Sequence, residues 1–122
     1  MPQVREPLEL VRHADVLLYG IGRAMDLAQR RGLSRAEQET LRAEGAVAEA
    51  LGFYLNAEGH VVGGGSSLAF KPEDIGRKNR AAAVAAGRAK AEAILAVCAH
   101  HPHKLLVVDE GAALRMLELL RP

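Results

Sequence analysis

The chain has little of what several common classes of protein depend on. Its one cysteine, Cys98, cannot form an internal disulfide and is typical of a chain in a reducing compartment. Aromatic residues make up 3% of the sequence and tryptophan is absent, which argues against stacking platforms for single-stranded nucleic acid. The 16 basic and 15 acidic residues give a formal net charge of +1, so no strong basic field indicates a nucleic-acid-binding surface.

Long apolar runs are missing as well. No run approaches the roughly 20 residues that a membrane span needs, and the N-terminus has no apolar signal-peptide segment. We therefore expect a cytoplasmic protein with no membrane partner. The 122 residues suffice for one domain with a real core and leave no room for a second independent module. Residues 1–122 are accordingly expected to form a single domain.

Short apolar runs that end at glycine alternate with segments of helical periodicity, and this pattern predicts an α/β fold. The alanine-rich run at 80–86 has helix propensity, but a helix of useful length already follows Gly87, so we predict a strand there. Residues 45–52 are rich in small side chains and favour neither a helix nor a strand. The expected strands are 15–19, 80–86 and 103–108, with a hairpin over 53–62; the expected helices are 7–13, 23–31, 34–43, the segment after Gly87 and 109–120, with a short helical turn at 71–75.

The predicted architecture is a mainly parallel sheet flanked by helices, with a small β-hairpin beside it. In such sheets ligands bind beyond the carboxyl ends of the strands. Gly20, Gly22, Gly87 and Asp109 would all lie at that edge. Asp109 is also placed to cap the last helix.

The glycine turn at Gly87 is followed three residues later by Lys90, at the start of an apolar helix. Backbone N–H groups at a helix start are unpaired and carry partial positive charge, and the lysine adds a full one. This layout favours an anion site. A glycine before an alanine-rich helix also serves simply to close a turn, and that reading stays open.

Two other patterns suggest functions that we do not favour. Residues 27–35 have the turn chemistry of a helix-turn-helix, but the second helix would carry Glu37, Glu39 and Glu44 against DNA phosphates, so two sheet-covering helices are the preferred interpretation. The three histidines within 100–103 are interrupted by a proline and have no cysteine or carboxylate at ligand spacing, so we expect no metal site. No nucleophile and base can be paired from the order of residues, and we expect no catalysis and no cofactor.

Four segments, in this order and covering nearly the whole chain, resemble the effector-binding domain of SorC/DeoR-type bacterial transcriptional regulators, closest to the branch that controls central glycolytic genes. The resemblance implies a Rossmann-like fold similar to sugar-phosphate isomerases and CoA transferases. It also implies a domain that binds a phosphorylated sugar, in this branch fructose 1,6-bisphosphate or a related sugar phosphate, without converting it. The segments are DVLLYGIG (15–22), GAVAEALGFYL (45–55), VAAGRAKAEAI (84–94) and LVVDEGAA (106–113).

The same resemblance implies ligand contacts at Arg30, Glu49 and Lys90, together with the backbone at the glycines named above, Gly20, Gly22 and Gly87. Arg30 and Lys90 would neutralise phosphate oxygens, and Glu49 would accept hydrogen bonds from sugar hydroxyls. The alternative is a small enzyme of the sugar-phosphate isomerase type, with Glu49 as general base.

The chain departs from the family pattern at specific places. It has Arg23 where an acidic residue usually follows the second glycine, and Ala48 where a glycine is usual. The family's helix-turn-helix and the first part of its effector domain have no counterpart, so we expect only the C-terminal part of that domain here, with DNA contacted only through the missing part. Exposed sheet surface left by that absence predicts a homo-oligomer, a dimer in the simplest case.

Overall fold

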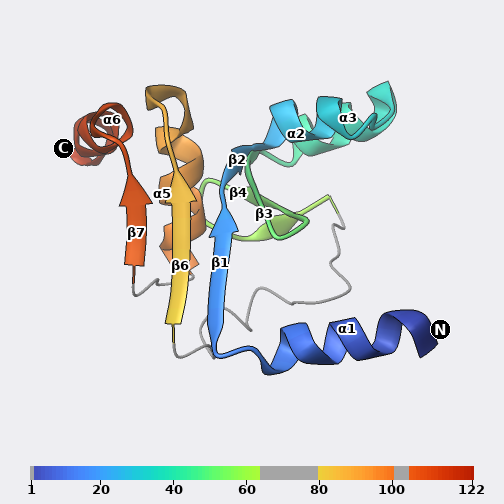
Figure 1. The fold of residues 1–122 in the computed structure, drawn as a ribbon. Coiled ribbons are helices and arrows are strands. Elements are labelled where there is room, and N and C mark those ends of the chain that lie inside the picture. The colour runs from blue at the N-terminus through green and yellow to red at the C-terminus, as the bar shows by residue number, and fades with distance from the viewer. Residues whose placement is uncertain (1, 64–79, 101–104) are drawn as a thin grey trace.

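The computed structural model describes residues 2–63, 80–100 and 105–122 (Figure 1). The turn expected at 71–75 and the histidines at 101 and 103 lie outside these residues. The elements in chain order are α1 (Pro2–His13), β1 (Val16–Gly20), β2 (Gly22–Arg23), α2 (Ala24–Arg30), α3 (Arg35–Ala43), β3 (Ala46–Ala50), β4 (Phe53–Asn56), β5 (Val61–Val62), β6 (Arg80–Ala85), the 3-10 turn η1 (Arg88–Lys90), α5 (Ala91–His100), β7 (Leu105–Val108) and α6 (Glu110–Leu120).

Three parallel strands form the first sheet, in the order β1-β6-β7. The alanine-rich segment is the central strand, β6, as predicted, because short side chains let α5 pack closely on one face. Ile94 and Val97 of α5 are fully buried there. Helices that alternate with parallel strands confirm the predicted α/β fold (Figure 1).

Four antiparallel strands form a second, smaller sheet in the order β2-β3-β4-β5. The predicted hairpin is β4 and β5, but it is part of this larger sheet, since the unassigned segment 45–52 forms β3 and its turn. That turn places both Leu51 (φ 55°) and Gly52 (φ 87°) in the left-handed region, as a two-residue hairpin turn requires. Arg23, expected in a helix, instead ends β2 and precedes α2.

Helices α2 and α3 lie over the second sheet. The turn between them is closed at Gly32 (φ 71°) by N–H groups that donate back to the last turn of α2, and α3 begins with the predicted capping box of Ser34 and Glu37. Ala28 of α2 and Leu41 of α3 are buried and belong to one cluster with Tyr54 of β4. The helix pair therefore covers a sheet, which confirms the preferred interpretation of residues 27–35.

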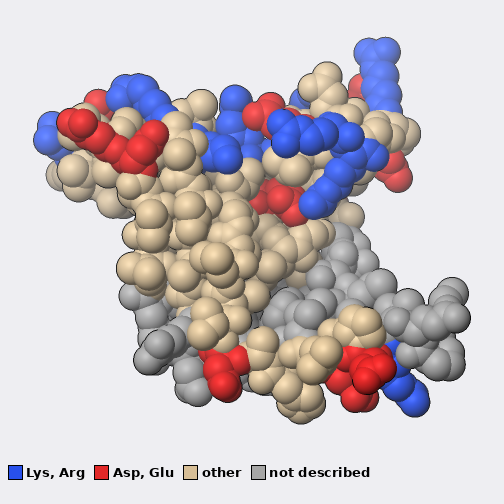
Figure 2. All heavy atoms as spheres, in the orientation of Figure 1, with Lys and Arg blue, Asp and Glu red and all other residues tan. Residues whose placement is uncertain are grey.

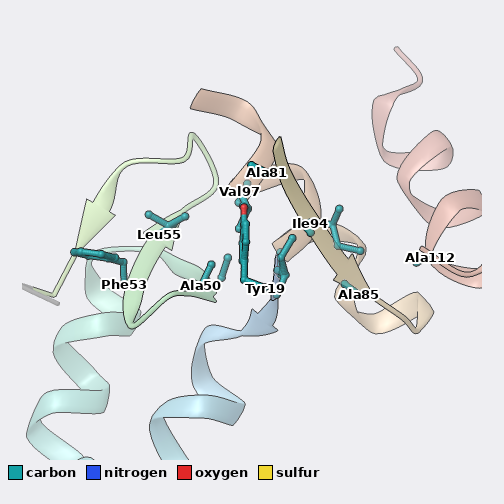
Figure 3. Packing of buried hydrophobic residues seen from close by; sticks show 14 of the residues in the cluster. Tyr19, Ala50, Phe53, Leu55, Ala81, Ala85, Ile94, Val97 and Ala112 are labelled. Carbon is teal, nitrogen blue, oxygen red and sulfur yellow. The ribbon is translucent and has the colours of Figure 1, made fainter. Parts of the chain in front are cut away.

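One apolar core joins the two sheets through α5 (Figure 3). Tyr19 of β1, Leu55 of β4 and Ile94 of α5 belong to the same buried cluster. The small antiparallel sheet is thereby fixed against the end of the parallel one. Within the described part of the chain, no helix has the length and apolar character needed to cross a membrane.

Candidate functional site

The carboxyl ends of β1, β6 and β7 meet at one edge of the parallel sheet. Gly20 ends β1 opposite Val84 of β6, and β7 ends directly before Asp109. The predicted convergence of the glycine segments and Asp109 is confirmed. Two structures lie at this edge: the small antiparallel sheet with Glu49, and the loop from Gly87 to Lys90 (Figure 1).

Glu49 is a buried carboxylate in the middle of the small sheet, with 7% of its surface exposed. It lies opposite Gly22 of β2 and Tyr54 of β4. Its Oε1 accepts a hydrogen bond from Arg31 Nη2 at 2.8 Å and another from the Gly52 N–H at 2.9 Å. The carboxylate is therefore held rigidly, and both bonds use the same oxygen.

Arg31 is the arginine that reaches Glu49, one residue beyond the arginine that the resemblance implies. Helix α2 ends at Arg30, and the turn through Gly32 directs Arg31 toward the small sheet, whereas Arg30 is exposed and forms no ion pair with any residue that the structure describes. Partial burial opposes the charge of Arg31, but the hydrogen bond and charge of Glu49 outweigh that effect and raise the pKa of Arg31.

Tyr54 places a further polar group beside this pair. Its side chain is buried, and its hydroxyl forms no hydrogen bond of good geometry among the described residues, although it lies near enough to Arg31 to contribute, after Glu49, to the raised pKa of Arg31. A buried hydroxyl without a partner costs free energy, and such groups often await a ligand or water. Neither Arg31 nor Tyr54 was identified as a site residue from the sequence, because their proximity to Glu49 depends on the turn after α2 and on the register of β3 and β4.

The loop at the end of β6 is held by Asp109. The Gly87 N–H donates to both carboxylate oxygens at 3.1 Å, while Oδ1 also accepts from the Ala112 N–H at 2.9 Å and so caps α6 as predicted. These hydrogen bonds, Ala112 first, lower the pKa of Asp109. Asp109 thus joins two loops at the sheet edge, and the Gly87 N–H is already engaged.

Lys90 supplies the positive charge of this loop. It lies in the 3-10 turn before α5 rather than in the first turn of the helix itself. The neighbouring Arg88 is engaged by Glu118, at 2.8 and 3.3 Å, and Arg115 contacts the same carboxylate. Lys90 has no ion-pair partner within the described segments, so it remains available to an anion.

Glu49 and Lys90 do not contact each other through any described hydrogen bond or ion pair. They are related through β1 and its continuation: Gly20 pairs with Val84, three residues before Gly87, and Gly22 pairs with Glu49. The arrangement offers a fixed acceptor on one side of the edge and a free cation on the other. Across residues 2–63, 80–100 and 105–122, no three potential metal ligands come together.

Gly22 leaves no room for a side chain beside Glu49. A Cβ at this position would clash with Leu27 Cδ2 and would lie 3.8 Å from Glu49 Oε2. We predict that Gly22→Ala lowers the free energy of unfolding by about 1–3 kcal/mol, measured by urea denaturation. Gly45→Ala is the control for replacing a glycine where a side chain has space, because a Cβ at Gly45 meets nothing within 4 Å. Gly45 has a positive φ of 78°, so this variant reports the cost of backbone strain alone. If Gly22→Ala left both the stability and the Gly52 amide signal unchanged, the close packing at this place would be refuted.

Comparison with known proteins agrees with this geometry. The model of the family described as "Putative sugar-binding domain" matches residues 1–118. The chain is 40% identical over 116 residues to the central glycolytic genes regulator of Bacillus subtilis, covering 95% of this chain and 34% of that protein, and 36% identical over 112 residues to the same regulator of Priestia megaterium, covering 92% and 33%. The crystal structure of a SorC family transcriptional regulator from Enterococcus faecalis superposes with a TM-score of 0.87 at 33% identity, covering 96% of this chain and 48% of that chain.

The chain therefore spans about a third of these curated relatives and about half of that solved structure. Its match to the family model extends over nearly all of its length. The chain belongs to the sugar-binding domain family of SorC/DeoR-type bacterial transcriptional regulators.

Proposed function

We propose that this chain is the part of a transcriptional regulator of sugar catabolism that senses a phosphorylated sugar, fructose 1,6-bisphosphate or a related sugar phosphate, without converting it. The relatives that it matches regulate central glycolytic genes by name. The residues form a single domain that corresponds to the C-terminal part of a full effector-binding domain. In this proposal the protein is cytoplasmic, and DNA is contacted by a separate N-terminal helix-turn-helix.

The observation that carries the proposal is the buried Glu49 carboxylate in the small sheet, at the same end of the parallel strands as the Gly87–Lys90 loop, whose lysine forms no ion pair among the described residues. Glu49 Oε1 is occupied by Arg31 and the Gly52 N–H, which leaves Oε2 to accept hydrogen bonds from sugar hydroxyls. A carboxylate fixed in advance loses little conformational entropy when the sugar binds, which favours affinity. The Tyr54 hydroxyl, which lies near Arg31, would donate to a further sugar oxygen.

The phosphate groups would be bound by cations. Lys90 has no described ion-pair partner, and Arg30 is exposed at the end of α2, where its guanidinium can bind phosphate in a bidentate manner. Of the glycines proposed as backbone contacts, Gly87 has open space where a side chain would stand and Gly20 has only the Val84 carbonyl nearby, whereas at Gly22 that space is filled by Leu27.

The isomerase alternative receives no specific support from the geometry of Glu49. Oε2 of Glu49 would serve a general base and a hydrogen-bond acceptor alike, so the preference for a sensor rests on the relatives, which are named as regulators. Incubation of the chain with ketose and aldose phosphates, followed by NMR, is expected to show no interconversion. Enzyme-dependent turnover that Glu49→Gln abolishes would replace the sensor proposal with the enzyme.

We predict that fructose 1,6-bisphosphate raises the melting temperature of the chain and that Lys90→Ala removes most of the increase. A ligand that binds only the folded state at a hundredfold excess over its Kd stabilises it by about 2.7 kcal/mol. Arg121→Ala, which removes an exposed cation beyond the end of α6, is the matched control and should retain the full increase. An equal increase in Lys90→Ala and wild type would remove Lys90 from the site, and no increase in wild type at millimolar ligand would contradict binding by this chain.

A further inference from the structure

Arg31 is paired with a buried carboxylate, which distinguishes it from other paired arginines in the described part of the chain. Its Nη2 lies 2.8 Å from Oε1 of Glu49, and the Glu49 side chain is 9% exposed. Exposed pairs contribute little to stability, whereas a buried carboxylate depends on its cation. By contrast with this pair, both side chains are at least 38% exposed in the ion pairs formed by Arg23, Arg35, Arg88 and Arg115.

Arg31 reaches the carboxylate from the end of α2. Glu49 lies opposite Gly22 on β2 and opposite Tyr54 on β4, so these residues share one face of the small sheet. Helix α2 covers that face, since Leu27 fills the space beside Gly22. The Arg31 N–H donates to the Leu27 carbonyl at 2.9 Å, which fixes the backbone from which the guanidinium extends. The Tyr54 hydroxyl lies near the same guanidinium, so Arg31 is held by its backbone and by two side chains of the sheet.

The two oxygens of Glu49 have different surroundings. Oε1 accepts from Arg31 at 2.8 Å and from the Gly52 N–H at 2.9 Å. Oε2 accepts no hydrogen bond from any residue that the structure describes. Two donors on one oxygen define the orientation of the carboxylate, because a rotation would break both bonds at once. Arg31 and the Gly52 N–H therefore keep Oε2 available to a ligand.

Other cations are available to the phosphate groups of the proposed ligand. Figure 2 shows basic side chains gathered along the upper margin of the molecule, over α6, α2 and α3. The strands of the parallel sheet end toward the same margin (Figure 1). Within the described segments Lys90 and Arg30 belong to no ion pair, whereas Arg31 is committed to Glu49.

We infer that Arg31 is a positioning residue of the proposed phosphosugar site, which holds Glu49 in the orientation that leaves Oε2 for the sugar hydroxyls. The inference rests on the proposed function and deepens it, because it divides the cations of the site between two tasks. Arg31 orients the carboxylate and does not touch the ligand, while the exposed cations bind the phosphate groups. An acceptor that is oriented in advance loses little conformational entropy on binding, so disordering it weakens every ligand that offers the same hydroxyls.

Calorimetric titration of the intact 122-residue chain tests this role with two probes, fructose 1,6-bisphosphate and fructose 6-phosphate. Salt at about 0.3 M limits the reach of exposed charges to roughly 6 Å. Arg31→Gln is expected to weaken both ligands by the same factor, on the order of tenfold, because both offer hydroxyls to Glu49. Arg31→Lys keeps a charged donor and should recover part of the affinity. Arg35→Gln, which removes an exposed arginine paired with a glutamate, is the matched control and should bind like wild type.

A measurement without ligand shows whether Arg31 acts on Glu49 locally. Hydrogen exchange of the Gly52 amide should become faster in Arg31→Gln, because the acceptor of that N–H loses its second donor and is freer to rotate. The Gly87 amide, which donates to Asp109, should keep its rate. Faster exchange at both glycines would indicate a general loosening of the fold and would overturn a local positioning role.

A double-mutant cycle separates positioning from direct contact with the ligand. With Glu49→Gln already in place, the further change Arg31→Gln should have little effect on either probe. This double variant leaves no buried charge unpaired, so it carries the test even if Arg31→Gln alone does not fold.

The inference is overturned if the double variant binds more weakly than Glu49→Gln, or if Arg31→Gln weakens the bisphosphate more than the monophosphate. Either result would place Arg31 against the phosphate itself. Wild type that bound neither probe would overturn the proposed function as well, whereas binding that does not respond to Arg31→Gln would overturn this inference alone.

Discussion

Replacing Glu49 with glutamine is expected to weaken fructose 1,6-bisphosphate binding by at least roughly tenfold, since hydrogen bonds to a charged group contribute about 1.5–3 kcal/mol. Glutamine has nearly the same shape, so its amide oxygen can still accept from the Gly52 N–H. It lacks the negative charge that holds Arg31 at 2.8 Å and the second acceptor oxygen that faces the sugar. Isothermal titration calorimetry measures the change in Kd.

Glu39→Gln is the control for the loss of a carboxylate that pairs with an arginine. Glu39 forms an ion pair with Arg35 on the exposed surface of α3, with Arg35 Nε 3.4 Å from Glu39 Oε1. Exposed pairs of this kind contribute little, so both stability and affinity should match wild type. Equal affinity of Glu49→Gln and wild type would show that the buried carboxylate does not contact the sugar.

Replacing Asp109 with alanine is expected to lower the melting temperature by several degrees and to weaken ligand binding at the Gly87 loop. The change removes the N-terminal cap of α6 and also the acceptor of the Gly87 N–H. Asp109→Asn is the more specific variant, because its single carbonyl oxygen can cap α6 through Ala112 while it holds Gly87 less well. Differential scanning calorimetry and calorimetric titration separate the two effects.

The same residue predicts a dependence on pH. Hydrogen bonds to the Asp109 carboxylate lower its pKa from the ordinary 3.8 in the folded state. The charged Asp109 carboxylate therefore stabilises the folded protein fully above pH 3.8. This stabilisation is lost as the pH falls through the lowered pKa of Asp109 in the folded state. The difference in melting temperature between wild type and Asp109→Asn should be largest near neutral pH and shrink in acid. A difference that stayed constant into strong acid would refute a role for the charge.

The parallel sheet could be predicted from the sequence, because its strands are compact runs that end at glycine or at a helix cap. β6 is the informative case. Its alanines favour a helix, but the turn at Gly87 and the helix that follows leave the segment the length and position of a strand, and the structure confirms it.

The small sheet could be predicted only in part. β3 contains three alanines and the buried Glu49, which are depleted in strands, and only Val47 favours one; it forms because β2 and β4 provide backbone partners on both sides. Its turn requires Leu51 in the left-handed region at φ 55°, which no sequence rule would assign to leucine.

The details of the site depended on contacts between distant residues. Two adjacent arginines stand at the end of α2. The resemblance implied Arg30 as a phosphate contact, which stays a prediction, and the pairing of its neighbour Arg31 with Glu49 could not be predicted because it depends on the exact end of the helix. Asp109 was predicted as a cap from its local position, but its bond to Gly87 joins residues 22 apart in sequence. The sequence motifs identified the end of the sheet where the candidate site lies, whereas the contacts between its side chains depend on the turns after α2 and after β6.

If the small sheet and the Gly87 loop form one phosphosugar site, an amide-detected NMR titration with fructose 1,6-bisphosphate should detect binding on both sides at once. Gly52 and Gly87 report on the two sides, because one N–H donates to Glu49 and the other to Asp109. We predict that both glycine signals shift along a single saturation curve, and that Lys90→Ala weakens the response of both. Shifts confined to one glycine, two different saturation curves, or changes only at residues far from the strand ends would contradict it.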